Sequence, residues 1–184
     1  MLIKRLNLKN WRAFPGENLI EFSTDPKKPI TIVHAENEFG KTSLLSAIRW
    51  CLHETVPPNV DDKLIDSNTK GPAEVELLIE SDFEGKKYDY KVSRKIEKSG
   101  VTNLTVLIDR GNGFDTPTMS DKDIISNLLP EELCDIFLFS GENLSKAFQD
   151  KDGNKVRDSI LKVTGISNAD ITLEYLKEFV TLKE

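Results

Sequence analysis

The sequence predicts an α/β fold, in which a mixed central sheet is combined with an antiparallel β-subdomain and a C-terminal helix. Three observations support this prediction. Apolar strands precede an amphipathic helix near the N-terminus, the hydrophobic period changes to two in the middle of the chain, and a helical period returns towards the end. The 184 residues are enough for one domain with a hydrophobic core. We expect a lobe over residues 1–165 and the start of a coiled-coil helix over residues 166–184.

Three strands and a helix are expected in the N-terminal part of the chain. Apolar residues share one face in each of the first two strands, and residues 30–33 form a continuous apolar run that is typical of a strand covered on both faces. The residues that define the first two strands are Leu2, Leu6, Leu8, Ile20 and Phe22. The helix is indicated by apolar residues at helical spacing, namely Leu44, Leu45, Ile48, Cys51 and Leu52. It should end before Pro57.

The antiparallel β-subdomain is expected over about residues 73–109. Apolar and polar residues alternate there in three runs, which are separated by turn-forming residues such as Gly85. Such alternation is typical of antiparallel strands with one face in water.

Helical signals return after this region. Ser120, with Asp123 three residues later, is a variant of the capping box. Residues 136–139 form a short apolar run that we interpret as a buried strand, and helices should follow at 154–164 and from Ser167 to the end. In this final segment, apolar residues step by three and four, as in a coiled coil, although an ordinary amphipathic helix fits the same spacing. These are Ile166, Ala169, Leu173, Leu176 and Val180.

Composition restricts the class of protein. With 38% hydrophobic and 30% charged residues the chain is globular. No apolar run approaches the ~20 residues of a membrane span, and the first residues do not resemble a signal peptide, so we expect a cytoplasmic protein with no membrane partner. Cys51 and Cys134 are then expected to be buried, reduced thiols. The net charge of −6 means that any contact with DNA needs a local basic patch or a partner chain.

Residues 35–42 carry the strongest chemical signal. They match the phosphate-binding pattern G-x-x-x-x-G-K-[ST] at every defined position except the first, where Ala35 stands. The backbone N–H groups of residues 38–42 would cradle phosphates at the start of a helix. Lys41 would reach the β- and γ-phosphates, and the Thr42 hydroxyl would bind Mg²⁺. The predicted cofactors are therefore ATP and Mg²⁺.

The residues around this loop resemble a known family. Residues 2–14 read LIKRLNLKNWRAF, residues 17–23 read ENLIEFS, and residues 30–52 read ITIVHAENEFGKTSLLSAIRWCL. This order resembles the start of SMC, RecF, RecN and SbcC-type P-loop ATPases of the ABC class. The GKTSLLSAIRWCL segment and DIFLFSGE at residues 135–142 look most like the DndD-type ATPases of DNA sulfur modification and restriction.

The resemblance implies a set of site residues. Those for nucleotide binding are Arg12, Asn37, Glu38, Phe39, Gly40, Lys41, Thr42 and Ser43. Metal binding would fall to Thr42 and to Ser140, which stands where break-repair members carry a glutamine. Glu38 and Phe39 depart from the usual small residues of the loop.

The sequence lacks a Walker B motif, because no run of four apolar residues is followed by Asp-Glu. We therefore expect no catalytic base within these residues. In the family this motif lies beyond a long coiled coil, so the resemblance implies an N-terminal lobe that needs the C-terminal lobe of the same ATPase. It also implies a homodimer whose heads sandwich ATP, double-stranded DNA as a partner at the nucleoid, and a nuclease or modification-system protein as a further partner.

Three alternative functions would require different sequence features. A small GTPase would carry D-x-x-G and N-K-x-D at separate places, whereas the similar stretches 150–153 and 154–158 adjoin, and the second is one residue too long. A nucleoside-type kinase would have an Arg-rich lid and no antiparallel meander. A docking module that binds nucleotide without turnover remains open, because the chain lacks a Walker B motif.

A basic stretch within the β-subdomain is the candidate DNA contact. It contains Lys86, Lys87, Lys91, Arg94, Lys95 and Lys98. On a strand, Lys87, Lys91 and Lys95 share the face that should be solvated. This face could bind the duplex backbone, or it could be an ordinary solvated strand face, and both interpretations stay open.

Overall fold

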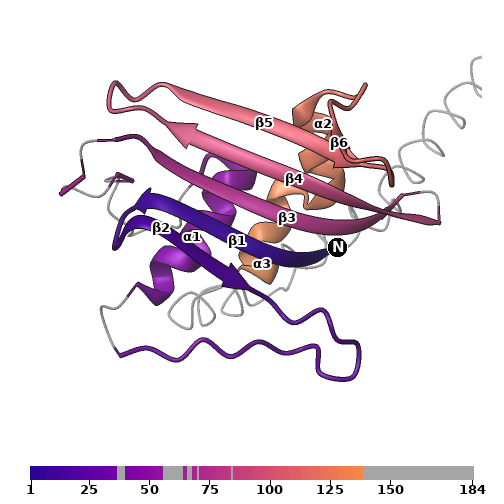
Figure 1. The fold of residues 1–184 in the computed structure, drawn as a ribbon, viewed down its shortest axis with the longest axis horizontal. Helices are drawn as coiled ribbons and strands as arrows, with labels where there is room; N and C mark the ends of the chain where they lie inside the picture. The colour runs from indigo at the N-terminus through magenta and orange to yellow at the C-terminus, as the bar shows by residue number, and fades with distance from the viewer. Residues whose placement is uncertain (37–39, 56–63, 66–67, 70, 84, 139–184) are drawn as a thin grey trace, which may run out of the picture. The chain divides into compact units, whose positions relative to one another are not determined.

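The computed structural model describes residues 1–36, 40–55, 64–65, 68–69, 71–83 and 85–138 (Figure 1). The predictions for Asn37, Glu38, Phe39 and Ser140, and for the helices of residues 154–184 with their coiled coil, lie outside these residues. The chain divides into two compact units, Met1–Glu131 and Glu132–Glu184. The sheet and the two long helices belong to the first unit.

A six-stranded antiparallel sheet forms the centre of the first unit (Figure 1). Its strands are β1 (Leu2–Trp11), β2 (Phe14–Glu21), β3 (Ala73–Phe83), β4 (Lys86–Ile96), β5 (Thr102–Asp109) and β6 (Phe114–Asp115). Their order is β2-β1-β3-β4-β5-β6, and every neighbouring pair is antiparallel. The α/β class and the antiparallel β-subdomain are thus confirmed, while the described strands form an antiparallel rather than a mixed sheet.

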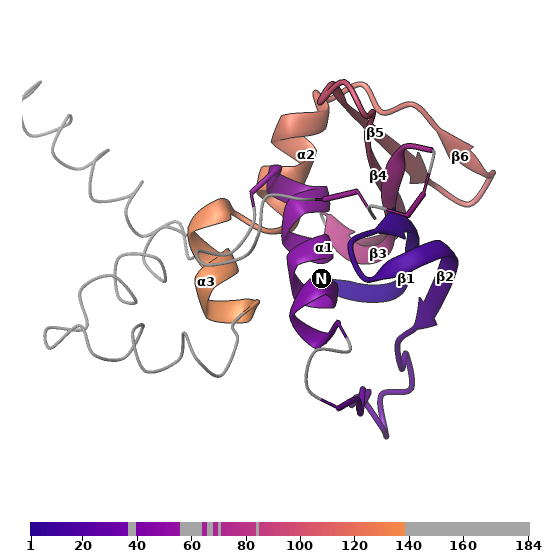
Figure 2. The same ribbon diagram turned by 90° about the vertical axis from the view of Figure 1, so that its left-hand side faces the viewer.

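Two helices cover one face of this sheet, as Figure 2 shows. These are α1 (Lys41–His53) and α2 (Asp121–Leu128). The predicted cap of α2 is present, because the Ser120 hydroxyl accepts a hydrogen bond from the Asp123 amide at 3.2 Å. A 3₁₀ turn (Glu131–Leu133) follows, and the second unit contains the short helix α3 (Cys134–Phe137).

The hydrophobic core lies between the sheet and these helices. Alternate residues of the strands contribute one side of it, as their period of two predicts: Leu6, Leu8, Val75, Leu77, Ile79, Val92 and Val106 are buried. α1 contributes Ala47, Ile48, Trp50, Cys51 and Leu52. The two cysteines are buried and form no disulfide, as predicted. The Cys51 thiol lies 3.3 Å from the carbonyl oxygen of Val75, and burial raises its pKa to about 12.

The segment before α1 differs from the sequence prediction. Residues 30–33 were expected to form a strand covered on both faces, but no strand is assigned there. The exposed fraction is 76% for Ile30 and 85% for Ile32. A strand of this kind needs a hydrogen-bonded neighbour and a layer on each face, and none of the six described strands pairs with this segment.

The short apolar run at residues 136–139 was also interpreted wrongly. Cys134–Phe137 is a helix, and the Phe137 side chain is 63% exposed. Short apolar runs fit a strand and a helix equally well by periodicity. Among the described residues, no helix is long and apolar enough to span a membrane.

Candidate functional site

The start of α1 has the features of an anion site. Gly40 is its N-cap, with φ of 88° and ψ of 10°, and the Leu44 amide donates to the Gly40 carbonyl at 3.0 Å. Within the described residues no side chain caps α1, and the first turn of the helix contains no acidic residue. The first amides of a helix have no partners within the helix and lie at the positive end of its dipole. The start of α1 can therefore accept an anion.

Gly40 is required at its position for two reasons. Its φ lies in the left-handed region, which favours glycine. A Cβ there would also lie 3.0 Å from Cε2 and Cζ of Phe14 and 3.6 Å from Cβ of Ala13. The same distances show that Ala13 and Phe14 lie directly against Gly40, at the start of α1.

Lys41 is exposed, and its ammonium group bends back over the loop before α1. Nζ donates to the carbonyl oxygens of Ala35 and Glu36, each at 2.6 Å. The predicted Mg²⁺ ligand Thr42 is exposed one residue later. The cation and the hydroxyl predicted from the motif are therefore both accessible beside the uncapped helix start.

The loop between β1 and β2 consists of Arg12 and Ala13, since Trp11 pairs with Phe14. Arg12 has φ of 49°, which is unfavourable for a residue with a side chain. Its amide donates to the carbonyl oxygen of Leu64 at 3.0 Å. The backbone of Arg12 is thus tied to Leu64, and the neighbouring Ala13 lies against Gly40 at the start of α1; the contact of Arg12 with phosphate stays a prediction.

Trp11 joins this loop to α1. The side chain is completely buried, and Nε1 donates to the carbonyl oxygen of Ser43 at 3.0 Å. Its ring lies 4.8 Å from the ring of Trp50, at an interplanar angle of 37°. Trp11 thus contacts both the first and the last turns of the helix that begins at the phosphate-binding loop. Sequence periodicity did not single it out, because the contact joins distant parts of the chain.

The C-terminal end of α1 is held by Arg94 of β4. Arg94 belongs to the basic stretch predicted as a DNA contact, but only 6% of the Arg94 residue is exposed. Nε donates to the Cys51 carbonyl at 3.0 Å and Nη2 to the Leu52 carbonyl at 3.2 Å, while Nη1 lies 2.9 Å from the Glu54 carboxylate. These carbonyls lack partners within the helix, and a cation is favourable at this end of its dipole. Arg94 is therefore a helix cap and not part of a surface patch.

His53 lies in the same last turn of α1. Burial lowers its pKa, and a backbone hydrogen bond with Leu129 partly opposes that shift. Nε2 is buried without a hydrogen-bond partner among the described residues. The neutral imidazole is therefore favoured in the folded protein.

The three lysines predicted to contact DNA lie on the sheet face opposite α1 and α2, which we call the outer face. Lys87 is 2.8 Å from the Glu80 carboxylate, and this hydrogen bond raises the pKa of Lys87. Lys95 is 2.7 Å from the Glu97 carboxylate. Lys91 lies over the Phe114 ring, 4.8 Å from its centroid. Their solvated face is as predicted, and each has a partner.

Acidic and basic strands alternate across the outer face. From β2 to β4 the outward charged residues are Glu17 and Glu21, then Lys4, Arg5 and Lys9, then Glu74, Glu76 and Glu80, then Lys87, Lys91 and Lys95. Asp89 interrupts the last set and forms an ion pair with Lys4 at 2.8 Å. The outer face is thus a mosaic of both signs.

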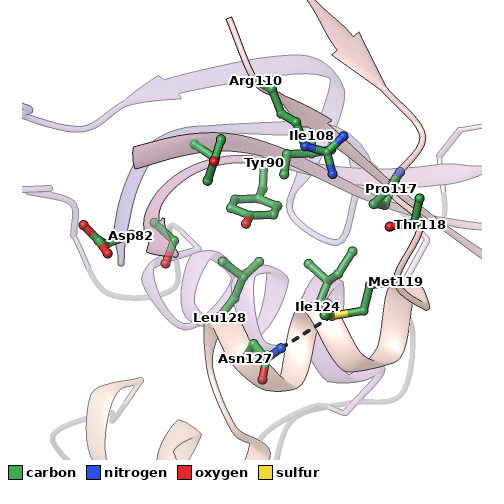
Figure 3. Close-up of a pocket in the computed structure, with 12 residues that line it drawn as sticks. Asp82, Tyr90, Ile108, Arg110, Pro117, Thr118, Met119, Ile124, Asn127 and Leu128 are labelled. Carbon is green, nitrogen blue, oxygen red and sulfur yellow. Dashed lines mark hydrogen bonds between the residues drawn. The ribbon is translucent and has the colours of Figure 1, made fainter. Parts of the chain in front are cut away.

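A separate cavity of about 250 Å³ lies between α2 and the strands β3, β4 and β5 (Figure 3). The Tyr90 ring points into it, and burial raises the pKa of Tyr90. None of the residues predicted for nucleotide or DNA lines this cavity. Within the described part of the chain, no cluster of three His, Cys, Asp or Glu side chains could hold a metal ion.

Comparison with known proteins identifies the family. A family model described as an AAA domain matches residues 5–183, and the chain belongs to this family. It is 26% identical over 165 residues to the chromosome partition protein Smc of Halothermothrix orenii, covering 74% of this chain and 14% of that protein. It is 35% identical over 100 residues to the DNA double-strand break repair Rad50 ATPase of Halobacterium salinarum, covering 54% and 10%. The chain thus spans a small part of these relatives.

Two solved structures are also similar to this chain. The recombination mediator protein RecF, in its RecF-ATP form, matches 96% of this chain and 46% of its own, with 21% identity and a TM-score of 0.51. The SMC head domain from Thermotoga maritima matches 67% and 41%, with 25% identity and a TM-score of 0.44. The prediction of an SMC-like ATPase head is confirmed, and the RecF structure shows a similar fold; the DndD-type branch stays a prediction.

Proposed function

We propose that this chain is the ATP-binding lobe of an SMC-like, DNA-associated ATPase that works in the cytoplasm. The observation that carries the proposal is the position of Lys41, exposed at the first residue of α1 with its ammonium 2.6 Å from the Ala35 and Glu36 carbonyls. A cation in this place, beside uncapped helix amides, fits a polyphosphate. The RecF-ATP neighbour supports ATP as the nucleotide.

Each residue of the site has a definite task in this proposal. The amides at the start of α1 bind phosphate oxygens, and Lys41 leaves the two carbonyls to neutralise the β- and γ-phosphates. Thr42 supplies a hydroxyl to Mg²⁺, whose other ligands would be phosphate oxygens and water. When bound, Mg²⁺-ATP supplies a γ-phosphoryl group for hydrolysis. Arg12 adds a second cation from the loop between β1 and β2.

A partner lobe is part of the proposal. The apolar residues Ile30, Ile32 and Val33 are exposed immediately before the phosphate-binding loop. Exposed apolar segments of this kind mark surfaces that another chain segment covers. We propose that the C-terminal lobe of the same ATPase covers them and provides the Walker B acid and the signature motif. Two such heads would sandwich ATP, and hydrolysis would release them on DNA.

Replacing Lys41 tests the nucleotide site. In isothermal titration with ATP and Mg²⁺, Lys41→Ala should abolish binding, because the remaining contacts do not replace this cation. Lys27→Ala, in an exposed loop of the same chain, is the matched control and should bind as the wild type does. Unchanged affinity in Lys41→Ala would show that the nucleotide site is elsewhere. Binding at one ATP per chain with negligible turnover would support a lobe that needs its partner.

The DNA contact is proposed at the outer face, through Lys87, Lys91 and Lys95. Reversal of all three to Glu should weaken duplex binding by the assembled head and leave ATP affinity unchanged. Wild-type binding should be independent of sequence and fall steeply with salt. Reversal of Lys27, Lys28 and Lys122, which lie off the sheet, makes the same change in net charge and serves as the control. Equal loss in both triple variants would mean that net charge alone matters and would place the contact elsewhere.

The pathway is proposed at the level of the family only: break repair, chromosome organisation, or defence linked to DNA modification. A sulfur-modification operon beside the gene would support the DndD-type branch. A neighbouring nuclease of the break-repair type would contradict that branch and support the Rad50-like role.

A further inference from the structure

We propose that Trp11 is a positioning residue for nucleotide binding, which holds the loop of Arg12 against the first turn of α1. This inference rests on the proposed ATP site. Trp11 itself is completely buried, so it acts through its neighbours and touches no ligand.

The contacts of Trp11 connect two parts of the candidate site. Its indole N–H donates to the carbonyl oxygen of Ser43, 3.0 Å away, in the first turn of α1. Its backbone adjoins Arg12 and pairs with Phe14 across the loop. This hydrogen bond is therefore the side-chain link between the strand next to Arg12 and the helix that carries Lys41 and Thr42.

The ring of Trp11 is itself held in place. It packs against Trp50 in the last turn of α1, with centroids 4.8 Å apart. The guanidinium of Arg94, on β4, lies 5.9 Å from the centroid of the Trp50 ring. It is held there by its hydrogen bonds to the carbonyl oxygens of Cys51 and Leu52 at the end of α1. The side chains of Trp11, Trp50 and Arg94 thus pack α1 against β1 and β4. They also hold the Trp11 indole so that its N–H points at the Ser43 carbonyl.

The backbone of Arg12 explains why a hydrogen bond one residue away should matter. Its positive φ of 49° is an unfavourable conformation that the surroundings must maintain. Without the bond from Trp11 to Ser43, the loop can relax, and the Arg12 side chain then changes direction. Small displacements of a group that binds a ligand reduce affinity markedly.

Trp11→Phe is the decisive variant, because it keeps an aromatic ring and removes only the N–H donor and part of the ring. In a titration of the whole chain with ATP and Mg²⁺, the Kd should rise about threefold to tenfold, as for the loss of one hydrogen bond. Val106→Ala is the control: this residue is buried in β5, far along the sheet from the loop. The unfolding midpoint of Val106→Ala should fall about as far as that of Trp11→Phe, while its Kd for ATP stays unchanged.

A double-mutant cycle separates positioning from simple loss of stability. If Trp11 acts through Arg12, then Trp11→Phe should leave the Kd unchanged in an Arg12→Ala chain. Full additivity of the two changes, or an unchanged Kd in Trp11→Phe alone, would overturn the inference. Failure of the wild type to bind ATP would instead overturn the proposed function.

A second substitution keeps the test available if Trp11→Phe does not fold. Benzothienylalanine has nearly the shape of tryptophan but carries sulfur in place of the N–H. It can be incorporated at Trp11 alone in a Trp50→Phe chain, since the protein has two tryptophans, and compared with the same chain containing Trp11. A higher Kd with benzothienylalanine supports the inference, and an equal Kd contradicts it.

Discussion

Arg94 of β4 donates its Nε hydrogen to the carbonyl oxygen of Cys51, 3.0 Å away in the last turn of α1. This contact connects the end of the helix to β4, in the middle of the sheet. Arg94 is almost completely buried, so water cannot easily replace it as the partner of this carbonyl. The neighbouring ion pair with Glu54 contributes less, since the Glu54 side chain is 48% exposed.

Arg94→Met should therefore destabilise the fold by about 2–4 kcal/mol, because two helix carbonyls lose their partner inside the protein. Arg94→Lys should recover only part of this loss, since lysine lacks the planar fork. Urea unfolding followed by circular dichroism measures both changes. Lys95→Met, on the exposed face of the same strand, should change stability by no more than about 0.5 kcal/mol; a similar loss in both variants would contradict the capping role.

Gly40→Ala should destabilise the protein through both its φ and its contact with Phe14. Gly85 is a matched control, because its φ is +76° and a Cβ there would meet nothing within 4 Å. Gly85→Ala should cost about 1 kcal/mol, the cost of a left-handed residue with a side chain. Gly40→Ala should cost about 1–3 kcal/mol more, as measured by chemical unfolding. Equal losses would mean that the Phe14 ring moves away freely.

The stability of the protein should decrease with acid through His53. Burial lowers the pKa of His53 in the folded state, so the unfolded chain binds its proton first as the pH falls. The contribution is complete above the unfolded pKa of about 6.5, decreases below it, and levels off below the folded pKa. Urea unfolding across this range should show a smaller decrease for His53→Gln. His34→Gln removes the other histidine, in an exposed segment, and should leave the decrease in place.

Neither cysteine should react with a thiol reagent in the native protein. Both are buried, and the thiol of Cys51, with its pKa raised to about 12, is protonated at pH 8. Titration with an aromatic disulfide reagent should detect no free thiol before unfolding and two after addition of guanidinium chloride. Rapid labelling of Cys51 in the Cys134→Ser variant would show that the core opens near α1.

The parts of the fold that the sequence predicted are those set by local periodicity. The meander of β3, β4 and β5 follows from alternation of apolar and polar residues, and the α2 cap follows from Ser120 and Asp123. Residues 30–33 have the apolar composition of a buried strand, which is why the sequence predicts one there. Composition does not indicate whether another strand lies beside the segment to pair with it.

The candidate site was predicted in the same partial way. The motif identified Gly40, Lys41 and Thr42, because phosphate binding depends on residues adjacent in sequence. Arg94 belongs to the basic stretch of the sequence together with surface lysines. The alternation of residues along a strand does not indicate that one arginine caps a helix distant in sequence. The Trp11–Ser43 contact joins residues 32 positions apart, and periodicity carries no information about such pairs.

The mosaic of the outer face has a consequence for how a partner approaches it. Adjacent strands are about 4.8 Å apart, so charges of opposite sign cancel one another's potential within a distance shorter than the Debye length of about 8 Å. Glu74, Glu76 and Glu80 screen the lysines of β4 in this way. A polyanion in solution is then not attracted from afar, and it meets the face at the rate of ordinary diffusion. The outer face can distinguish one partner from another only at contact, where the spacing of its individual charges matches that of the partner.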